Sequence, residues 1–157
     1  GLFKDSPVVG KASGIIQSSS DKLFSFIGND LLDNYPRWSP EVKELEKLTE
    51  GPVQHGTLCR QVRIDQGNRS ESTFKVKIFE SGTRICFEGV SNPYRCDYVI
   101  EPINGSDSRL TFIFELLSLD LHVRPFEKLV RIAVQDGTER TVKNIKKLIE
   151  AQQADSN

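Results

Sequence analysis

The chain has 157 residues, of which 37% are hydrophobic and 27% are charged, and these values fit one globular domain with a sizeable core rather than a disordered chain. The 21 basic and 22 acidic residues give a formal net charge of -1. That balance excludes the basic surface of a typical nucleic-acid-binding protein, and it argues against a strongly anionic membrane surface as the main partner. We expect a single domain over residues 1–157, with loose ends at 1–7 and 153–157.

The first predicted elements are a weak strand over residues 8–17 and a short amphipathic helix over residues 20–29. The serines at 18–20 are candidate N-caps of this helix, and apolar residues follow them at helical spacing. One further helical turn is expected. After that turn, Pro36 and Pro40 predict a loop.

From residue 42 the hydrophobic period changes to two, which predicts a series of strands joined by turns. The first of these segments also suits a helix. Consecutive hairpins force a mostly antiparallel sheet with one apolar face. The expected strands cover residues 42–48, 58–64, 73–78, 84–88, 94–103 and 110–116. The residues expected to face inward are Leu58, Val62, Phe74, Val76, Ile78, Ile85, Phe87, Tyr98, Ile100, Leu110, Phe112 and Phe114.

After Pro125 the period returns to 3.6, which predicts one helix of about 25 residues and about 40 Å. A sheet of seven strands curls, so it can wrap around such a helix. The predicted fold is therefore an α+β helix-grip. It has a seven-stranded antiparallel curved sheet around a long C-terminal helix, with one or two short helices between the first two strands. Gly137, within the apolar stripe of the helix, either leaves volume beneath it or permits a close contact with the sheet.

Four segments carry a resemblance to a known family, and they cover residues 14–24, 35–42, 50–57 and 142–150. With the order of elements, they resemble the START/Bet v-allergen-like superfamily, also called SRPBCC, in its polyketide cyclase/dehydrase and lipid-transport group. The resemblance covers nearly the whole chain and implies the helix-grip fold. Members bind lipids, quinones, hormones or polyketides, and a minority catalyse cyclisation, dehydration or hydrolysis, so the fold alone does not fix the activity.

Candidate ligand-binding residues come from the predicted inward faces. Trp38 either packs on a ligand or pins its loop to the sheet. Arg60 is expected on the same inward face of its strand as Leu58 and Val62, so it needs a carboxylate from the protein or a ligand, unless a bulge or strand end turns it outward. The residues expected to line a cavity are Trp38, Leu58, Arg60, Val62, Phe74, Val76, Ile78, Phe87, Tyr98, Ile100, Phe112, Phe114, Leu129, Ala133 and Gly137.

This inward set is mostly apolar with few polar groups, which predicts a carrier or sensor of a hydrophobic small molecule such as a lipid, quinone or polyketide. One alternative is a cyclase, aromatase or dehydratase that uses Arg60 and Tyr98 to polarise a carbonyl group. A second alternative is an interaction protein with a filled core. No nucleophile, base and orienting group stand at a recognisable spacing. We therefore assign no catalytic residue and favour a protein that is not an enzyme.

The cysteines and histidines predict neither a disulfide nor a metal site. The three cysteines are odd in number and lack close spacing, and His55 and His122 have no Cys or carboxylate at ligand spacing. Strand alternation places Cys86 and Cys96 on opposite faces, which prevents a bond between them. We expect reduced thiols in a cytoplasmic protein that needs no cofactor.

No apolar run is long enough to cross a bilayer, and the first residues lack the layout of a signal peptide. The chain contains no methionine, so we interpret Gly1 as a trimmed end or a remnant of cloning, and either origin is compatible with a removed leader. Nothing in the sequence indicates an oligomeric state.

Overall fold

A computed structural model describes residues 7–156 and contains the predicted elements in the predicted order. The seven strands form one antiparallel sheet with the order β1-β7-β6-β5-β4-β3-β2. The elements are β1 (Val8–Ile16), α1 (Ser20–Phe24), the π-helix η1 (Ser25–Asn29), α2 (Leu31–Trp38), β2 (Val42–Lys47), β3 (Leu58–Asp65), β4 (Asn68–Glu80), β5 (Arg84–Gly89), β6 (Tyr94–Pro102), β7 (Ser108–Leu116), the 3-10 helix η2 (Leu121–Phe126) and α3 (Glu127–Ser156).

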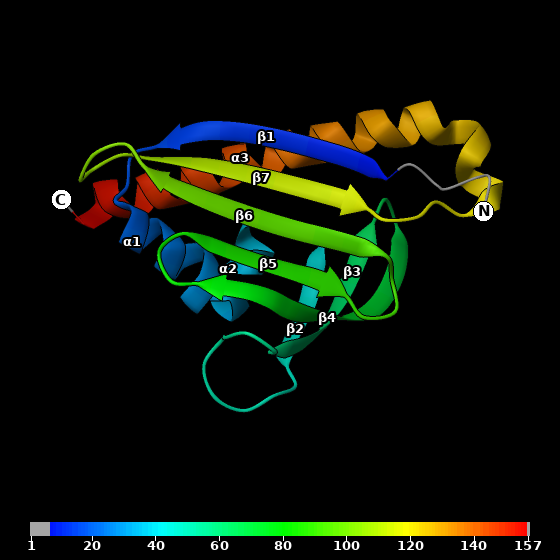
Figure 1. Cartoon of the computed structure of the whole chain (residues 1–157), viewed down its shortest axis with the longest axis horizontal. Helices are drawn as coiled ribbons and strands as arrows, with labels where there is room; N and C mark the ends of the chain where they lie inside the picture. The colour runs from blue at the N-terminus through cyan, green and yellow to red at the C-terminus, as the bar shows by residue number, and fades with distance from the viewer. Residues whose placement is uncertain (1–6, 157) are drawn as a thin grey trace.

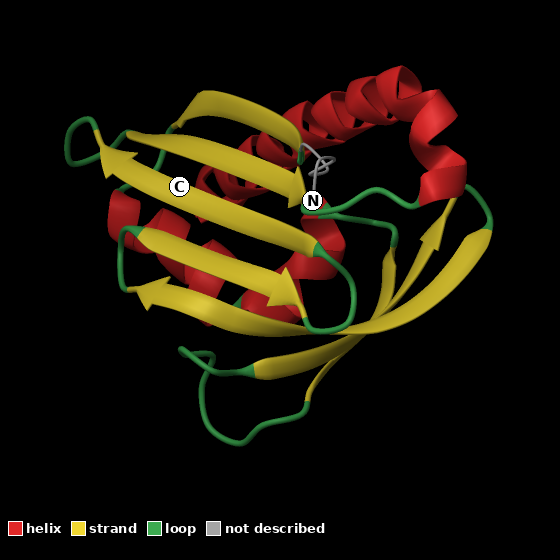
Figure 2. Ribbon diagram, turned by 45° about the vertical axis from the view of Figure 1, so that its right-hand side comes forward, coloured by secondary structure: helices red, strands yellow, loops and turns green. Residues whose placement is uncertain are grey.

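The sheet curves and keeps the helices on one face, so the structure confirms the helix-grip fold (Figures 1 and 2). The helix α3 packs against β1 and β7, while the shorter helices lie behind the middle of the sheet. The helix α2 continues through Pro36 and ends at Trp38. The expected loop at this position is therefore wrong. The lost backbone hydrogen bond of a proline in a helix is offset by burial of the aromatic side chains of Tyr35 and Trp38.

The core fills the closed end of the curved sheet. Its centre is aromatic: Phe74 stacks on Phe87 with ring centroids 4.3 Å apart, and the Tyr35 ring lies 5.5 Å from that of Phe87. The C-terminal half of α3 closes this core with Ile145 and Ile149, both buried. This half of the fold is solidly packed.

The N-terminal half of α3 extends beyond the core, so the predicted apolar stripe is only partly covered. Thirty residues of helix span about 45 Å, whereas the nine residues of β1 span about 30 Å. Figure 1 shows the start of α3 projecting past the N-terminal end of β1. Leu129, expected to line a cavity, is 65% exposed as a result. The helix also continues to Ser156 rather than ending near residue 152.

Strand β3 faces the opposite way from the prediction. Residues directly opposite one another in an antiparallel pair share a face, and buried Phe74 lies opposite Cys59. The interior face of β3 therefore carries Cys59 and the alternate residues after it. The residues expected to face inward, Leu58, Arg60 and Val62, belong to the outer face; Val62 is buried there, outside the main hydrophobic cluster.

A second departure occurs in β4. The register shifts between Val76 and Ile78, so that a bulge forms at Lys77. Because a bulge adds one residue to one strand, it exchanges the two faces beyond it. The inward residue after the bulge is Phe79, which packs edge-on against Phe24 at 5.2 Å, and Ile78 is half-buried.

Nine of the twelve residues expected to face inward are buried and the other three are half-buried. The predicted burial is thus better than the predicted direction, which is wrong in β3 and beyond the bulge in β4. The cysteine prediction is confirmed: Cys86 is opposite Asp97 while Phe87 is opposite Cys96, and all three thiols are free and buried.

The close approach of β1 to α3 depends on Gly10. A Cβ atom at this position would overlap the hydroxyl of Thr138 and stand 3.0 Å from the carbonyl oxygen of Val134. We expect Gly10→Ala to lower the free energy of unfolding by about 1–3 kcal/mol, as overpacking does, measured by urea denaturation. Gly137→Ala is the matched control, since its Cβ would meet only Arg140 at 3.6 Å. A Gly10→Ala protein as stable as the parent would contradict the tight contact.

Candidate functional site

A cavity of about 680 Å³ lies between the open end of the curved sheet and the first half of α3. Its walls come from β3, β4, β6 and β7, from the end of α2, and from α3 between Val130 and Asn144. Exposed residues on the β3–β4 hairpin, on the loop that contains Asn92 and Pro93, and on α3 form its rim. The cavity therefore opens to solvent beside the first half of α3.

The buried floor of the cavity is aromatic. Tyr98 stacks on Phe112 with a centroid distance of 4.5 Å, and Trp38 meets Tyr98 edge-on at 5.8 Å. Nearer the rim, Tyr94 stacks on Phe114 at 6.1 Å. Flat aromatic surfaces of this kind suit a planar or apolar ligand.

Trp38 is held in place from two sides. Its Nε1 donates a hydrogen bond to the hydroxyl of Tyr98 at 3.2 Å, and its carbonyl oxygen accepts one from Nδ2 of Asn144 at 3.0 Å. Its side chain is 1% exposed. Trp38 thus fixes the end of α2 to the sheet and to α3, and the same ring forms part of the cavity floor.

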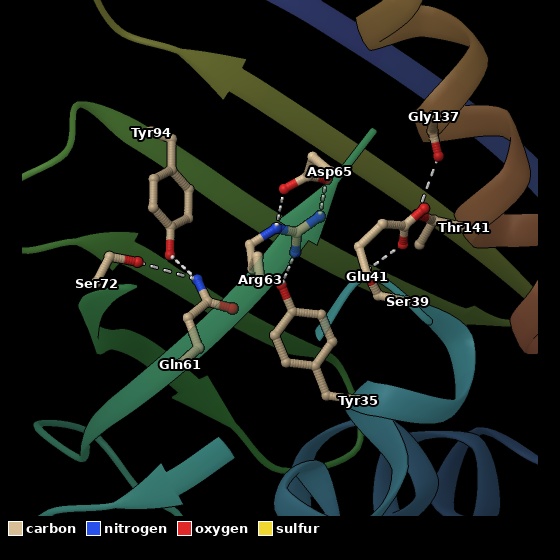
Figure 3. A network of polar contacts seen from close by, with 10 residues as sticks. All are labelled: Tyr35, Ser39, Glu41, Gln61, Arg63, Asp65, Ser72, Tyr94, Gly137 and Thr141. Carbon is tan, nitrogen blue, oxygen red and sulfur yellow. Dashed lines mark hydrogen bonds and ion pairs between the residues drawn. The ribbon is translucent and has the colours of Figure 1, made fainter. Parts of the chain in front are cut away.

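A cationic side chain enters the cavity from β3 (Figure 3). Arg63 donates to both carboxylate oxygens of Asp65 at 3.2 Å and to the hydroxyl of Tyr35 at 3.3 Å. These bonds use three of the five N–H groups of a guanidinium. Burial lowers the pKa of Arg63, but the adjacent Tyr35 and Asp65 outweigh that effect and raise the pKa overall. Arg63 therefore stays charged and can bind an oxygen atom of a ligand.

A buried amide lies on the same strand. Nε2 of Gln61 donates to the hydroxyl of Tyr94 at 2.9 Å and to Oγ of Ser72 at 3.5 Å. Its Oε1 is buried and makes no hydrogen bond within the described residues. Figure 3 shows that this oxygen points away from Ser72. Since a buried unpaired acceptor is costly, it is a place where a hydroxyl group could bind.

Three tyrosine hydroxyls line the cavity, and each accepts one hydrogen bond. The donors are Arg63 to Tyr35, Gln61 to Tyr94 and Trp38 to Tyr98. Burial raises the pKa of all three phenols above the ordinary value. They are therefore protonated at neutral pH, and each keeps a proton that it can donate to a ligand acceptor.

Six of the residues expected to line a cavity do so, and nine lie elsewhere. The first group is brought together at the cavity: Trp38, Tyr98, Phe112, Phe114, Ala133 and Gly137. The others face the packed core, the outer face of the sheet or the exposed side of α3: Leu58, Arg60, Val62, Phe74, Val76, Ile78, Phe87, Ile100 and Leu129.

Arg60 is the most consequential correction. It lies on the outer face of β3, where Nε donates to Glu71 at 2.6 Å and Nη1 is 3.7 Å from Glu46. The alternative that Arg60 points outward is therefore the correct one, although the cause is the reversed face of the strand, and its carboxylates belong to the neighbouring strands β2 and β4. Arg63, three residues later, lines the cavity, as does Arg140 of α3, and the sequence argument missed Arg63 together with Gln61.

The described residues contain no group of three or more His, Cys, Asp and Glu side chains that could hold a metal ion. Within the same part of the chain, no helix is long and apolar enough to cross a membrane. A second hollow of about 730 Å³ lies between the short helices and the end of α3, and mainly charged and polar side chains line it. It offers no comparable aromatic surface.

Solved structures of the same fold include a known cyclase. The chain is similar to the Zhui aromatase/cyclase from Streptomyces sp. R1128, with a TM-score of 0.75, 12% identity, and coverage of 92% of this chain and 94% of the other. It is also similar to a START superfamily protein from Mycobacterium smegmatis, with a TM-score of 0.70, 15% identity, and coverage of 92% and 98%. At such low identity, these similarities show the fold alone.

The sequence comparison is more specific. No protein of curated function matches the chain at a significant level. The family model described as "Polyketide cyclase / dehydrase and lipid transport" matches residues 11–150. The match includes most of α3 and all seven strands, apart from the start of β1. The chain therefore belongs to the polyketide cyclase / dehydrase and lipid transport family.

Proposed function

We propose that the protein binds a hydrophobic small molecule, such as a lipid, quinone or polyketide, in this cavity as a carrier or sensor. The observation that carries the proposal is the open cavity of about 680 Å³ above an aromatic floor. Ligand pockets have this size and character, with a few placed polar groups. A cytoplasmic location goes with this proposal and stays a prediction.

The polar groups favour a ligand that carries acceptor oxygens. Arg63 and the hydroxyls of Tyr35 and Tyr98 present donors to the same space. Carbonyl, phenol and carboxylate oxygens would satisfy those donors. The apolar part of the ligand would lie against Phe112 and Phe114.

The structure weakens both alternative functions. A cyclase that pairs Arg60 with Tyr98 lacks support, because Arg60 faces away from the cavity. An enzyme of this kind would have to polarise a carbonyl with Arg63 and the tyrosine hydroxyls instead. A protein with a filled core is disfavoured, since the cavity of about 680 Å³ is well above the ~300 Å³ at which ligand pockets begin.

Gly137 provides a direct test of the binding site. It lines the cavity, and a Cβ there would meet only Arg140 at 3.6 Å, so a larger side chain has room. We expect Gly137→Leu to weaken binding of a hydrophobic fluorescent dye at least tenfold, while the urea midpoint stays near that of the parent. Gly137→Ala is the control and should gain up to about 1 kcal/mol from helix propensity.

Native mass spectrometry of the purified protein provides the second arm, because a carrier retains part of its ligand. Absence of dye or lipid binding at micromolar concentration would remove the proposal. A leucine variant that binds as tightly as the parent would show that the ligand lies elsewhere. A leucine variant that barely folds would show that Gly137 fills a tight contact instead.

A further inference from the structure

One hydrogen-bond acceptor in the wall of the cavity has no partner among the described residues. It is Oε1 of Gln61, a residue that lines the cavity and is only 2% exposed. In the part of the chain that the structure describes, every other buried side-chain nitrogen or oxygen makes a hydrogen bond. Native proteins rarely leave a buried polar group unpaired, because the group has lost its water and gained nothing in return. The exception in Gln61 therefore calls for a donor from a bound molecule.

The orientation of this amide is fixed by its other end. Nε2 of Gln61 donates to the hydroxyl of Tyr94 at 2.9 Å and to Oγ of Ser72, which lies directly opposite on β4, at 3.5 Å. Both partners line the cavity. Oε1 is on the side of the amide that is turned away from them (Figure 3). Gln61 thus presents an acceptor in one set direction.

A donor stands at a known spacing from this acceptor. Arg63 follows Gln61 by two residues on β3 and lines the same cavity, and side chains two residues apart share one face of a strand about 7 Å from each other. The guanidinium can only donate, whereas Oε1 can only accept. The stacked rings of Tyr98 and Phe112 line the cavity as well. The wall therefore offers one acceptor and one donor beside flat aromatic surfaces.

We propose that Gln61 selects a planar aromatic ligand that carries a hydroxyl group, with a carbonyl or similar acceptor oxygen at its other end. The hydroxyl donates to Oε1 of Gln61, and the acceptor oxygen binds Arg63. This inference rests on the proposed function and narrows it, because a saturated acyl chain or an unsubstituted quinone brings no donor and leaves Oε1 unpaired. A site whose buried polar group needs a ligand hydroxyl rejects analogues that lack one.

Fluorescence titration with three related probes tests this selection, at a pH at which the hydroxyl of the probe is protonated. The first probe is a hydroxynaphthyl ketone with its two oxygens at opposite ends of the ring system. The second is its methyl ether, and the third is the naphthyl ketone without the second oxygen. We expect the phenol to bind at least tenfold more tightly than either analogue. One analogue is larger than the phenol and the other is smaller, so size alone cannot produce this order.

Gln61→Met should abolish the preference, because methionine has a similar length but no strong hydrogen-bonding group. We expect the variant to bind the phenol at least tenfold more weakly than the parent does. It should bind the unsubstituted ketone as tightly as the parent or more tightly, since no amide is left unpaired. A general loss of structure would weaken all three probes and the hydrophobic dye alike. Tyr94→Phe is a milder second variant: it removes the hydroxyl that orients the amide, so it should also reduce the preference.

The outcomes separate this selection from ligand binding itself. Equal affinity of the parent for all three probes, with the dye still bound, would overturn the selection and leave the proposed function intact; water would then satisfy Oε1. Tighter binding of the methyl ether than of the phenol would also overturn it, because the amide would then present its nitrogen to the ligand. A preference that survives in Gln61→Met would assign the recognition to another group. Failure of the parent to bind the dye or any probe would instead remove the proposed function.

Discussion

Trp38→Ala is expected to lower the free energy of unfolding by about 3–5 kcal/mol, the range for truncating a large buried aromatic side chain. Trp38 is 1% exposed and its ring contacts those of Phe26, Tyr35 and Tyr98 at 6.0, 5.5 and 5.8 Å. Alanine would leave a void at the point where α2, the sheet and α3 meet. It would also remove the donor to the hydroxyl of Tyr98.

Trp38→Phe separates these two effects. Phenylalanine keeps most of the aromatic volume but cannot donate to Tyr98, so we expect a loss of about 1–3 kcal/mol from the unpaired buried hydroxyl and the smaller ring. Circular dichroism in urea is the suitable measurement, because Trp38 is the only tryptophan and its fluorescence disappears in both variants. A Trp38→Ala protein within 1 kcal/mol of the parent would show that the ring is not part of the packed core.

The fold could be predicted because two hydrophobic periods occupy separate parts of the chain. Period two over 42–116 and period 3.6 after Pro125 leave few arrangements for one curved antiparallel sheet and one long helix. The turn residues correctly predicted where the hairpins between the strands lie. Val62 is buried although it lies on the outer face of β3, so an apolar residue in an alternating pattern does not by itself fix which face of the strand is the inner one.

The turn between β3 and β4 explains why β3 faces the other way. Gln66 and Gly67 both have positive φ, 50° and 83°, and form a two-residue hairpin turn that pairs Asp65 with Asn68. Counting back from that pair sets Arg63 against Ser70 and Cys59 against Phe74. The well-patterned strand β4 would then have placed Arg63 inside. The inward assignment followed the apolar residues Leu58 and Val62 instead, and a shift of pairing by one residue reverses the face of the whole strand.

The shape and lining of the cavity could not be predicted from the sequence. The cavity lies between residues of β3, β4, β6 and β7 and the first half of α3. Its shape arises from packing between these distant elements. The residues it collects, such as Tyr35 of α2 and Arg63 of β3, are 28 positions apart. No local pattern of hydrophobicity marks them as neighbours.

The stability of the protein is expected to fall as the pH rises above 9, because several buried acids must lose a proton on unfolding. Burial raises the pKa of Cys59 from 9.0 to about 11 and that of Cys86 from 9.0 to about 12. Burial also raises the pKa of Cys96 and of the cavity tyrosines. All of these groups are neutral when protonated, and the folded state holds the protons more tightly than the unfolded chain does.

The sign follows from proton binding. Above pH 9 the unfolded chain has released thiol protons that the folded chain retains, so stability declines with pH, by up to about 1.4 kcal/mol per pH unit for each thiol. Between pH 8 and 10.5, the loss is up to about 2 kcal/mol for one thiol, with the tyrosines adding to it above pH 10. Well below pH 9 these groups are protonated in both the folded and the unfolded chain, so they cause no loss of stability there. Urea midpoints measured across this range give the slope.

Cysteine variants identify the groups responsible. Cys59→Ala and Cys86→Ala each remove one titrating thiol, so each should flatten the decline above pH 9 even though truncation lowers the stability at pH 8. The double variant should show a smaller decline between pH 9 and 10 than either single variant, and the remaining decline comes from Cys96, whose pKa is also raised. Equal midpoints at pH 8 and 10.5 in the parent, or an unchanged slope in the double variant, would show that these thiols ionise as freely in the folded chain as in the unfolded one. Because both side chains are buried, at 0% and 1% exposure, that result would require the sheet around them to open on the time scale of the measurement.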